Sequence, residues 1–136
     1  MSPENDKKLM EKFPKLFVPR GHWGPAYPEC GDGWFDILNT LCTCINHHAS
    51  KKGLTVYIAQ IKEKFGGLRF YVDGADETVH MLISFAEGIS FSTCEVCGDK
   101  GKERREGWIK VLCDKHHEEN VKQREEFNRK IKATSP

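Results

Sequence analysis

The chain has 136 residues, of which 38% are hydrophobic and 30% are charged. This composition is typical of one folded domain with a modest core, and it excludes an intrinsically disordered chain. With 21 basic and 20 acidic residues the net charge is +1, which argues against a dedicated binder of long duplex DNA, because such proteins are usually clearly basic.

The first part of the chain, residues 1–33, is expected to be an irregular arm and loop. Residues 1–13 form a polar lead-in, and the segment that follows is rich in proline and glycine. This segment also carries aromatic residues, which argue against disorder. We therefore expect an ordered loop that covers part of the core, and long ordered loops in small domains are usually functional.

Residues 34–92 are expected to form an α-β-β-α core. Apolar residues recur at helical spacing after Asp32, which would cap this first helix; they are Trp34, Ile37, Leu38, Leu41 and Ile45. Two strand-like runs then flank Gly66-Gly67, a pair typical of a hairpin turn. A second helix follows within residues 73–92, capped by Asp73 or Asp76, with its apolar stripe at Val79, Leu82, Ile83, Ala86 and Ile89. The predicted fold class is α+β, a small antiparallel hairpin packed with helices.

Residues 93–132 contain the spacing Cys94-x2-Cys97-x15-Cys113-x2-His116. Zinc takes four sulfur or nitrogen ligands in a tetrahedron, and a Cys-x-x-Cys turn supplies two of them. Cys113 and His116 would lie on one face at the start of a last, mostly polar helix. This order of knuckle, hairpin and helix resembles the treble-clef zinc finger and predicts one Zn²⁺ per chain. His117 is the alternative fourth ligand.

The predicted zinc has a structural role, because four protein ligands leave no open position for water. Treble clefs also occur in HNH nucleases, which place a general-base histidine on the hairpin before the helix. The corresponding segment here, "GKERREGWIKVL", contains no histidine. We therefore expect no catalytic residue and no enzymatic activity, with an HNH-like metal-dependent nuclease as an alternative.

The remaining cysteines are expected to be free thiols. Cys30, Cys42, Cys44, His47 and His48 have spacing that suits a second metal poorly, because residues two apart point to different helix faces. Residues 1–17 contain no apolar leader, and no apolar run is long enough to cross a membrane. We expect a cytoplasmic protein with reduced thiols and no membrane partner.

Candidate binding residues are concentrated in the loop and at the start of the first helix. Aromatic side chains can stack on a base while neighbouring cations hold a phosphate. The candidates are Arg20, His22, Trp23, Tyr27 and Trp34, together with Arg69 on the hairpin. The alternative is that the aromatic residues only plug the edge of the core. Lys62 and Lys64 on the hairpin are the next candidates, although such charges usually form a solvated sheet face.

Three blocks, "ECGDGWFDIL", "IKEKFGGLRFYV" and the zinc motif within residues 93–116, resemble a group of small zinc-binding proteins encoded by bacteriophages and prophages. The resemblance covers about residues 29–117 and implies an accessory protein in the host cytoplasm. We expect it to interfere with host antiviral defence by binding a host protein or a nucleotide signal. A nucleic-acid-binding zinc-finger module is the alternative, and the last helix could form an oligomer contact.

Overall fold

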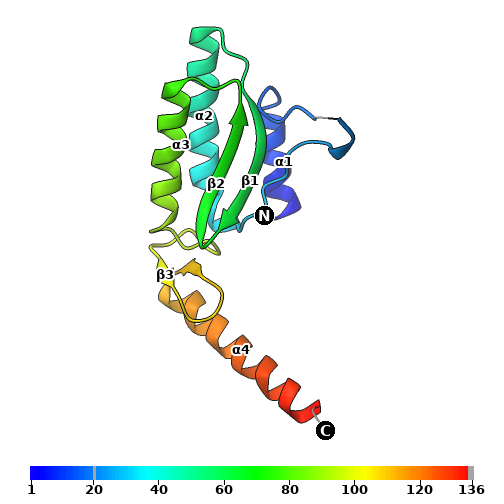
Figure 1. Cartoon of the computed structure of the whole chain (residues 1–136), viewed down its shortest axis with the longest axis vertical. Coiled ribbons are helices and arrows are strands. Elements are labelled where there is room, and N and C mark those ends of the chain that lie inside the picture. Colours follow the sequence, from blue (N-terminus) through cyan, green and yellow to red (C-terminus); the bar gives the residue numbers. More distant parts are fainter. Residues whose placement is uncertain (20, 135–136) are drawn as a thin grey trace.

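The computed structural model describes residues 1–19 and 21–134, and its architecture is α+β, as predicted (Figure 1). The described residues form two antiparallel hairpins, β1 (Tyr57–Lys64) with β2 (Gly67–Asp73) and β3 (Lys102–Arg104) with β4 (Lys110–Leu112). The helices are α1 (Pro3–Lys12), α2 (Phe35–Lys52), α3 (Glu77–Ser90) and α4 (Asp114–Thr134). Short 3-10 turns occupy Gly21–Trp23 and Asp32–Trp34.

The prediction that residues 1–33 are irregular is wrong at their start, where α1 forms. The Ser2 hydroxyl accepts a hydrogen bond from the Asn5 amide at 3.3 Å, and Pro3 follows in the first turn, as is usual at a helix start. Leu9 is fully buried, and Phe13 is 3% exposed just beyond the helix. Residues 1–13 are mostly polar, so the sequence did not indicate this helix, which contributes only one narrow apolar face to the core.

The prediction that Asp32 caps the first core helix is also wrong. Trp34 occupies the N-cap position of α2 and makes no side-chain capping bond. The Asp32 carboxylate instead accepts hydrogen bonds from the Ser2 amide at 2.8 Å and the Asn5 side-chain amide at 2.9 Å. These hydrogen bonds lower the pKa of Asp32. The residue thus joins α1 to the start of α2.

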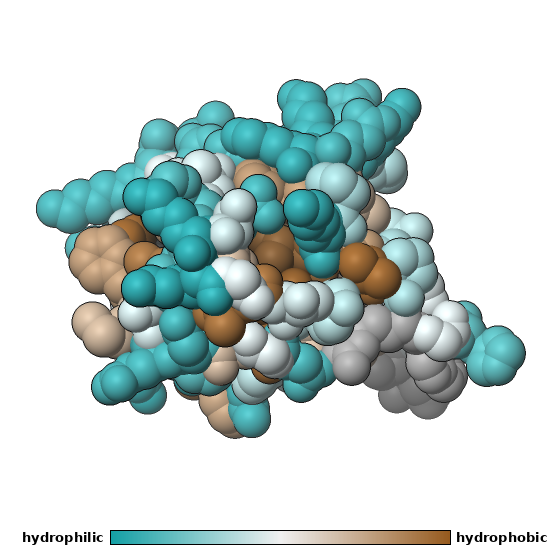
Figure 2. Space-filling view, turned by 90° about the horizontal axis from the view of Figure 1, so that it is seen from above, coloured by the Kyte–Doolittle hydropathy of each residue, from teal (hydrophilic) through white to brown (hydrophobic). Residues whose placement is uncertain are grey.

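The core lies between the β1–β2 hairpin and the helices α2 and α3, which cover one face of the sheet (Figure 1). Leu68 and Phe70 face this core, whereas Arg69 is half-buried and Tyr71 exposed, because successive side chains of a strand point to opposite faces. The chain after α1 lies along β1, because the Ile58 amide donates to the Leu16 carbonyl at 2.9 Å. At the end of the molecule opposite α4, hydrophilic side chains cover most of the surface, with smaller apolar areas between them (Figure 2).

The turn of the first hairpin lies one residue earlier than the Gly66-Gly67 pair suggested. Lys64 pairs with Gly67, so Phe65 and Gly66 form the two-residue turn. Their φ angles are 52° and 85°, as a type I′ turn requires. Gly67 is the first residue of β2, and its lack of a side chain leaves room for the Phe91 ring.

Of the two predicted caps of α3, Asp73 and Asp76, the structure has Asp76 at the N-cap position. The Asp76 carboxylate accepts the Val79 amide at 3.0 Å. Val79, Ile83 and Ala86 are buried, but Ile89 from the predicted stripe is 39% exposed. Ser90 takes the buried position at this end of the helix, and its hydroxyl accepts the Leu68 amide of β2 at 3.0 Å.

Helix α4 is mostly solvated and projects from the rest of the molecule, as its polar sequence predicted (Figure 1). None of its described side chains is buried, and Phe127 is 62% exposed. An oligomer contact through this helix stays a prediction. Within residues 1–19 and 21–134, no helix combines the length and the apolar run that a membrane crossing needs.

Candidate metal centre

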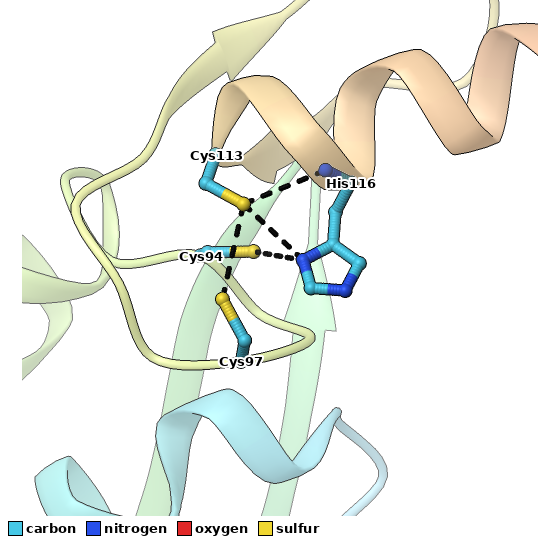
Figure 3. A group of neighbouring side chains, drawn as sticks. All are labelled: Cys94, Cys97, Cys113 and His116. Carbon is cyan, nitrogen blue, oxygen red and sulfur yellow. Dashed lines mark hydrogen bonds between the residues drawn. The ribbon is translucent and has the colours of Figure 1, made fainter.

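Four predicted ligands meet where the chain leaves α3 and enters α4. Cys94 and Cys97 lie in the turn that follows α3, Cys113 directly precedes α4, and His116 lies in the first turn of α4. Their side chains point toward one another (Figure 3). The three sulfur atoms and one histidine nitrogen all lie within 4.8 Å of one another.

The distances between these atoms fit a tetrahedral zinc ion. Bond lengths of about 2.3 Å to sulfur and about 2.0–2.1 Å to nitrogen place two sulfurs about 3.8 Å apart and a sulfur and a nitrogen about 3.6 Å apart. Cys97 Sγ lies 3.8 Å from Cys113 Sγ, and His116 Nδ1 lies 3.7 Å from Cys94 Sγ and 3.2 Å from Cys113 Sγ. The group can therefore hold one zinc ion through Nδ1 of His116.

His117 does not belong to this group. Its Nε2 lies 3.8 Å from Glu106 Oε1 on the β3–β4 loop. His116, by contrast, turns Nδ1 toward the sulfurs and leaves Nε2 3.9 Å from Glu119 Oε2. A carboxylate near the second nitrogen is common for metal-bound histidines, because it orients the ring.

The charges of the cysteine cluster favour a bound cation. Burial raises the pKa of the Cys94 thiol, but hydrogen bonds from the backbone amides of Cys113, Cys97 and Val96 outweigh it and lower the pKa. The Asp99 amide lowers the pKa of Cys97, but burial and the neighbouring sulfurs of Cys94 and Cys113 raise it to about 11. Without a metal, a thiolate at one cysteine disfavours ionisation of the neighbouring thiols. A divalent cation stabilises all the thiolates together.

The zinc-binding turn is docked on the segment before α2. The Gly33 amide donates to the Glu95 carbonyl at 2.8 Å, and the Gly31 amide donates to the Glu95 carboxylate at 2.9 Å. A Cβ atom added to Gly33 would lie 2.1 Å from the Cys94 carbonyl oxygen. The "GDGW" block is therefore explained by this close approach of two backbones.

Trp34 belongs to the core, and the prediction that it also contacts a partner is wrong. The side chain is fully buried, and its Nε1 donates to the Thr93 carbonyl at 2.9 Å. This bond ties the start of α2 to the residue before the first zinc ligand. A partner cannot reach the ring without unfolding this contact.

The other predicted binding residues are only partly brought together. Arg20 and the Trp23 side chain lie outside the described part of the structure. His22 is exposed, and Tyr27, which is 55% exposed, lines a surface hollow together with Tyr71. Arg69 lies directly opposite Lys62 across the hairpin, so both side chains occupy the outer face of the sheet.

Two exposed aromatic residues were not identified as candidate binding residues from the sequence. Phe65 is 68% exposed at the tip of the first hairpin, and Trp108 is 74% exposed on the β3–β4 loop. Both line one surface hollow with Lys62 and Lys64. Neither belongs to a periodic pattern, and the sequence signal was only a glycine beside each aromatic residue.

The second group of cysteines and histidines does not form a metal site among the described residues. Cys30 and Cys42 are buried, whereas Cys44 is exposed. Burial raises the pKa of both buried thiols to about 12, so they are ordinary core residues. His48 Nε2 lies 2.8 Å from Asp76 Oδ2, which joins α2 to the start of α3.

Comparisons of the chain with protein-family models, with curated proteins and with solved structures find no match.

Proposed function

We propose that the chain is a binding protein, not an enzyme, and that its zinc has a structural role. The observation that carries this proposal is the complete Cys3His group, in which Cys94, Cys97, Cys113 and His116 supply all four ligands of a tetrahedral ion. Such a closed shell contributes to folding and leaves no position for a substrate. Zinc would hold the turn that follows α3 against the start of α4.

The binding surface in this proposal is the outer face of the first hairpin, which we call the outer strip. It runs from the hollow beside the proline-rich loop to the tips of the two hairpins. Its members share exposure or half-exposure on a face that no described helix covers: Tyr27, Gln60, Lys62, Lys64, Phe65, Arg69, Tyr71 and Trp108. Aromatic residues and arginine, of which the strip has five, are enriched at binding surfaces.

The target suggested by the resemblance to phage proteins is a component of host defence, either a host protein or a nucleotide signal. This part of the proposal rests on the three sequence blocks alone. The outer strip supports it by offering a surface to which such a target can bind, and interference with the host stays a prediction.

Site-specific photo-crosslinking tests the proposed surface. Tyr71 is replaced by p-benzoyl-phenylalanine in the full chain, and cells producing the protein are irradiated. We expect a defined crosslinked product from position 71 and none when the same group replaces Phe85, a 72% exposed residue on α3. Products from position 85 alone, or from neither position, would contradict a binding role for the outer strip.

The nuclease alternative has its own test. The purified zinc-loaded protein is incubated with plasmid DNA and with RNA in the presence of magnesium or manganese. We expect no cleavage. If the protein cleaves nucleic acid and His117→Ala abolishes the cleavage, the nuclease alternative is favoured. His117 is not a zinc ligand, so its loss would then point to a role in catalysis.

A further inference from the structure

We infer that the outer strip binds single-stranded nucleic acid, with bases stacked on Phe65 and Trp108 and phosphates near Lys62, Lys64 and Arg69. This inference rests on the proposed binding role of the strip, and it assigns the strip a ligand other than the host protein or nucleotide signal that the resemblance implies. The two hairpin tips lie together because the zinc-binding unit, residues 93–132, packs against the turn of the first hairpin.

Phe65 occupies a position that its side chain disfavours. Its φ is 52°, in the left-handed region that type I′ turns normally fill with asparagine, aspartate or glycine. The ring is 68% exposed, so core packing does not offset the backbone cost. An unfavourable backbone angle at an exposed aromatic residue is the kind of feature found at functional sites.

Trp108 is exposed on a loop that is firmly attached. The Arg124 guanidinium donates to the Glu106 carbonyl and lies 3.8 Å from the Glu106 carboxylate. His117 approaches the same carboxylate. α4 thus holds the residue two positions before Trp108, and the attached loop presents the indole, which is 74% exposed.

The two tips are in contact through the residue after Trp108. A Cβ atom added to Gly66 would lie 3.1 Å from Ile109 Cγ2, so Ile109 packs on the turn that presents Phe65. Figure 1 shows this turn directed toward the zinc-binding unit. Phe65 and Trp108 then line a common hollow, a suitable platform for planar bases.

The cations beside this platform are available to an anionic partner. Lys62, Lys64 and Arg69 make no ion pair within 4.0 Å with any residue that the structure describes. Glu63 lines the same hollow, but its carboxylate accepts the Gly66 amide at 2.9 Å. Lys64 Nζ lies over the Phe65 ring, 5.8 Å from its centroid, and Arg69 Nη1 donates to the Leu68 carbonyl at 3.1 Å, so neither contact neutralises the cation. Cations without a described carboxylate partner beside exposed aromatic rings match a chain of phosphates that carries bases.

The length and shape of the strip favour a single strand. Gln60 to Lys64 spans about 13 Å at about 3.3 Å per residue, and Tyr27 and Tyr71 supply aromatic rings at the other end. One mononucleotide would leave much of this surface empty. A duplex hides its base faces inside the helix, so stacking on exposed rings requires an unpaired strand.

Fluorescence anisotropy with labelled 12-nucleotide strands tests the inference on the zinc-loaded full chain. Separate arms use single-stranded DNA, single-stranded RNA, the matching duplexes and mononucleotides. We expect at least one single-stranded arm to bind more tightly than its duplex and than any mononucleotide. Phe65→Asn and Trp108→Ala should each weaken that binding by about tenfold, on the scale of one lost base stack.

The variants separate binding from folding. Phe65→Asn places a turn-favoured residue at position 65, so the melting temperature should hold or rise while affinity falls. Phe85→Ala removes a similarly exposed ring elsewhere and should leave affinity unchanged. Lys62→Gln with Lys64→Gln should reduce the slope of log affinity against log salt by about 1.4 for two phosphate contacts, whereas Lys51→Gln with Lys52→Gln on α2 should not.

The inference is overturned if no single strand binds, if duplexes or mononucleotides bind as tightly, or if the Phe65 and Trp108 variants bind as well as the parent. A partner protein crosslinked at position 71 in the absence of any strand binding would also overturn it. That last result would leave the proposed binding role intact, so the two failures are distinguishable.

Discussion

The amide of Gly33 donates a hydrogen bond to the carbonyl of Glu95 across 2.8 Å, joining two segments that are 62 positions apart in the chain. One segment directly precedes α2, and the other lies between the first two zinc ligands. The metal centre is therefore attached directly to the core. Its loss should affect the whole molecule and not only the last helix.

Gly33→Ala should destabilise the protein by about 1–3 kcal/mol, because the new methyl group would overlap the Cys94 carbonyl. Thermal unfolding and zinc content measure the effect. Gly88→Ala is the matched control, since a Cβ at Gly88 meets nothing within 4 Å. Alanine within α3 should there add about 0.5–1 kcal/mol of stability, and equal losses in both variants would contradict the proposed close approach.

One zinc should bind per chain, and Cys97→Ala should lose it. Removing one of four ligands leaves an incomplete shell, and metal binding is coupled to folding in small zinc-binding units. Elemental analysis of the purified protein gives the stoichiometry, and protease sensitivity of residues 93–134 reports the loss of order. Cys44→Ala, an exposed thiol outside the group, should keep its zinc; full zinc content in Cys97→Ala would refute this ligand set.

Leu9→Ala should lower the free energy of unfolding by about 2–5 kcal/mol, the usual cost of truncating a buried leucine. The prediction follows from α1, in which Leu9 is fully buried. Denaturant unfolding measures the change, and Lys8→Ala on the exposed side of α1 should shift it by less than about 0.5 kcal/mol. A small effect at Leu9 would mean that α1 is not part of the core.

Asp76→Asn should make the free energy of unfolding less dependent on pH in the acidic range. Hydrogen bonds from His48 and then from the Val79 amide lower the pKa of Asp76 below its ordinary value of 3.8. A lowered pKa means that the carboxylate stabilises the fold above pH 3.8 and loses this effect as the pH falls through the folded-state pKa. Urea unfolding of both proteins between pH 6 and pH 3 should show their difference shrinking at low pH, and a constant difference would contradict the prediction.

Local signals were sufficient for several parts of this protein. The zinc ligand set depends on two short spacings, and a short spacing limits where side chains can point whatever the rest of the chain does. The β1–β2 hairpin and the Asp76 cap of α3 likewise depend on residues a few positions apart. The signals for α1 were also local, at Ser2 and Pro3, but the polar composition around them outweighed a single buried face.

Other features depend on atoms that only folding brings together. Asp32 has the residue type of a helix cap, yet its carboxylate binds the start of α1, about 30 positions earlier. The glycines at positions 33 and 66 resemble ordinary turn residues, but they make room for the zinc-binding turn and for Ile109. The pairing of Phe65 with Trp108, which are 43 positions apart, has no sequence period, because it results from the zinc-binding unit packing against the end of the first hairpin.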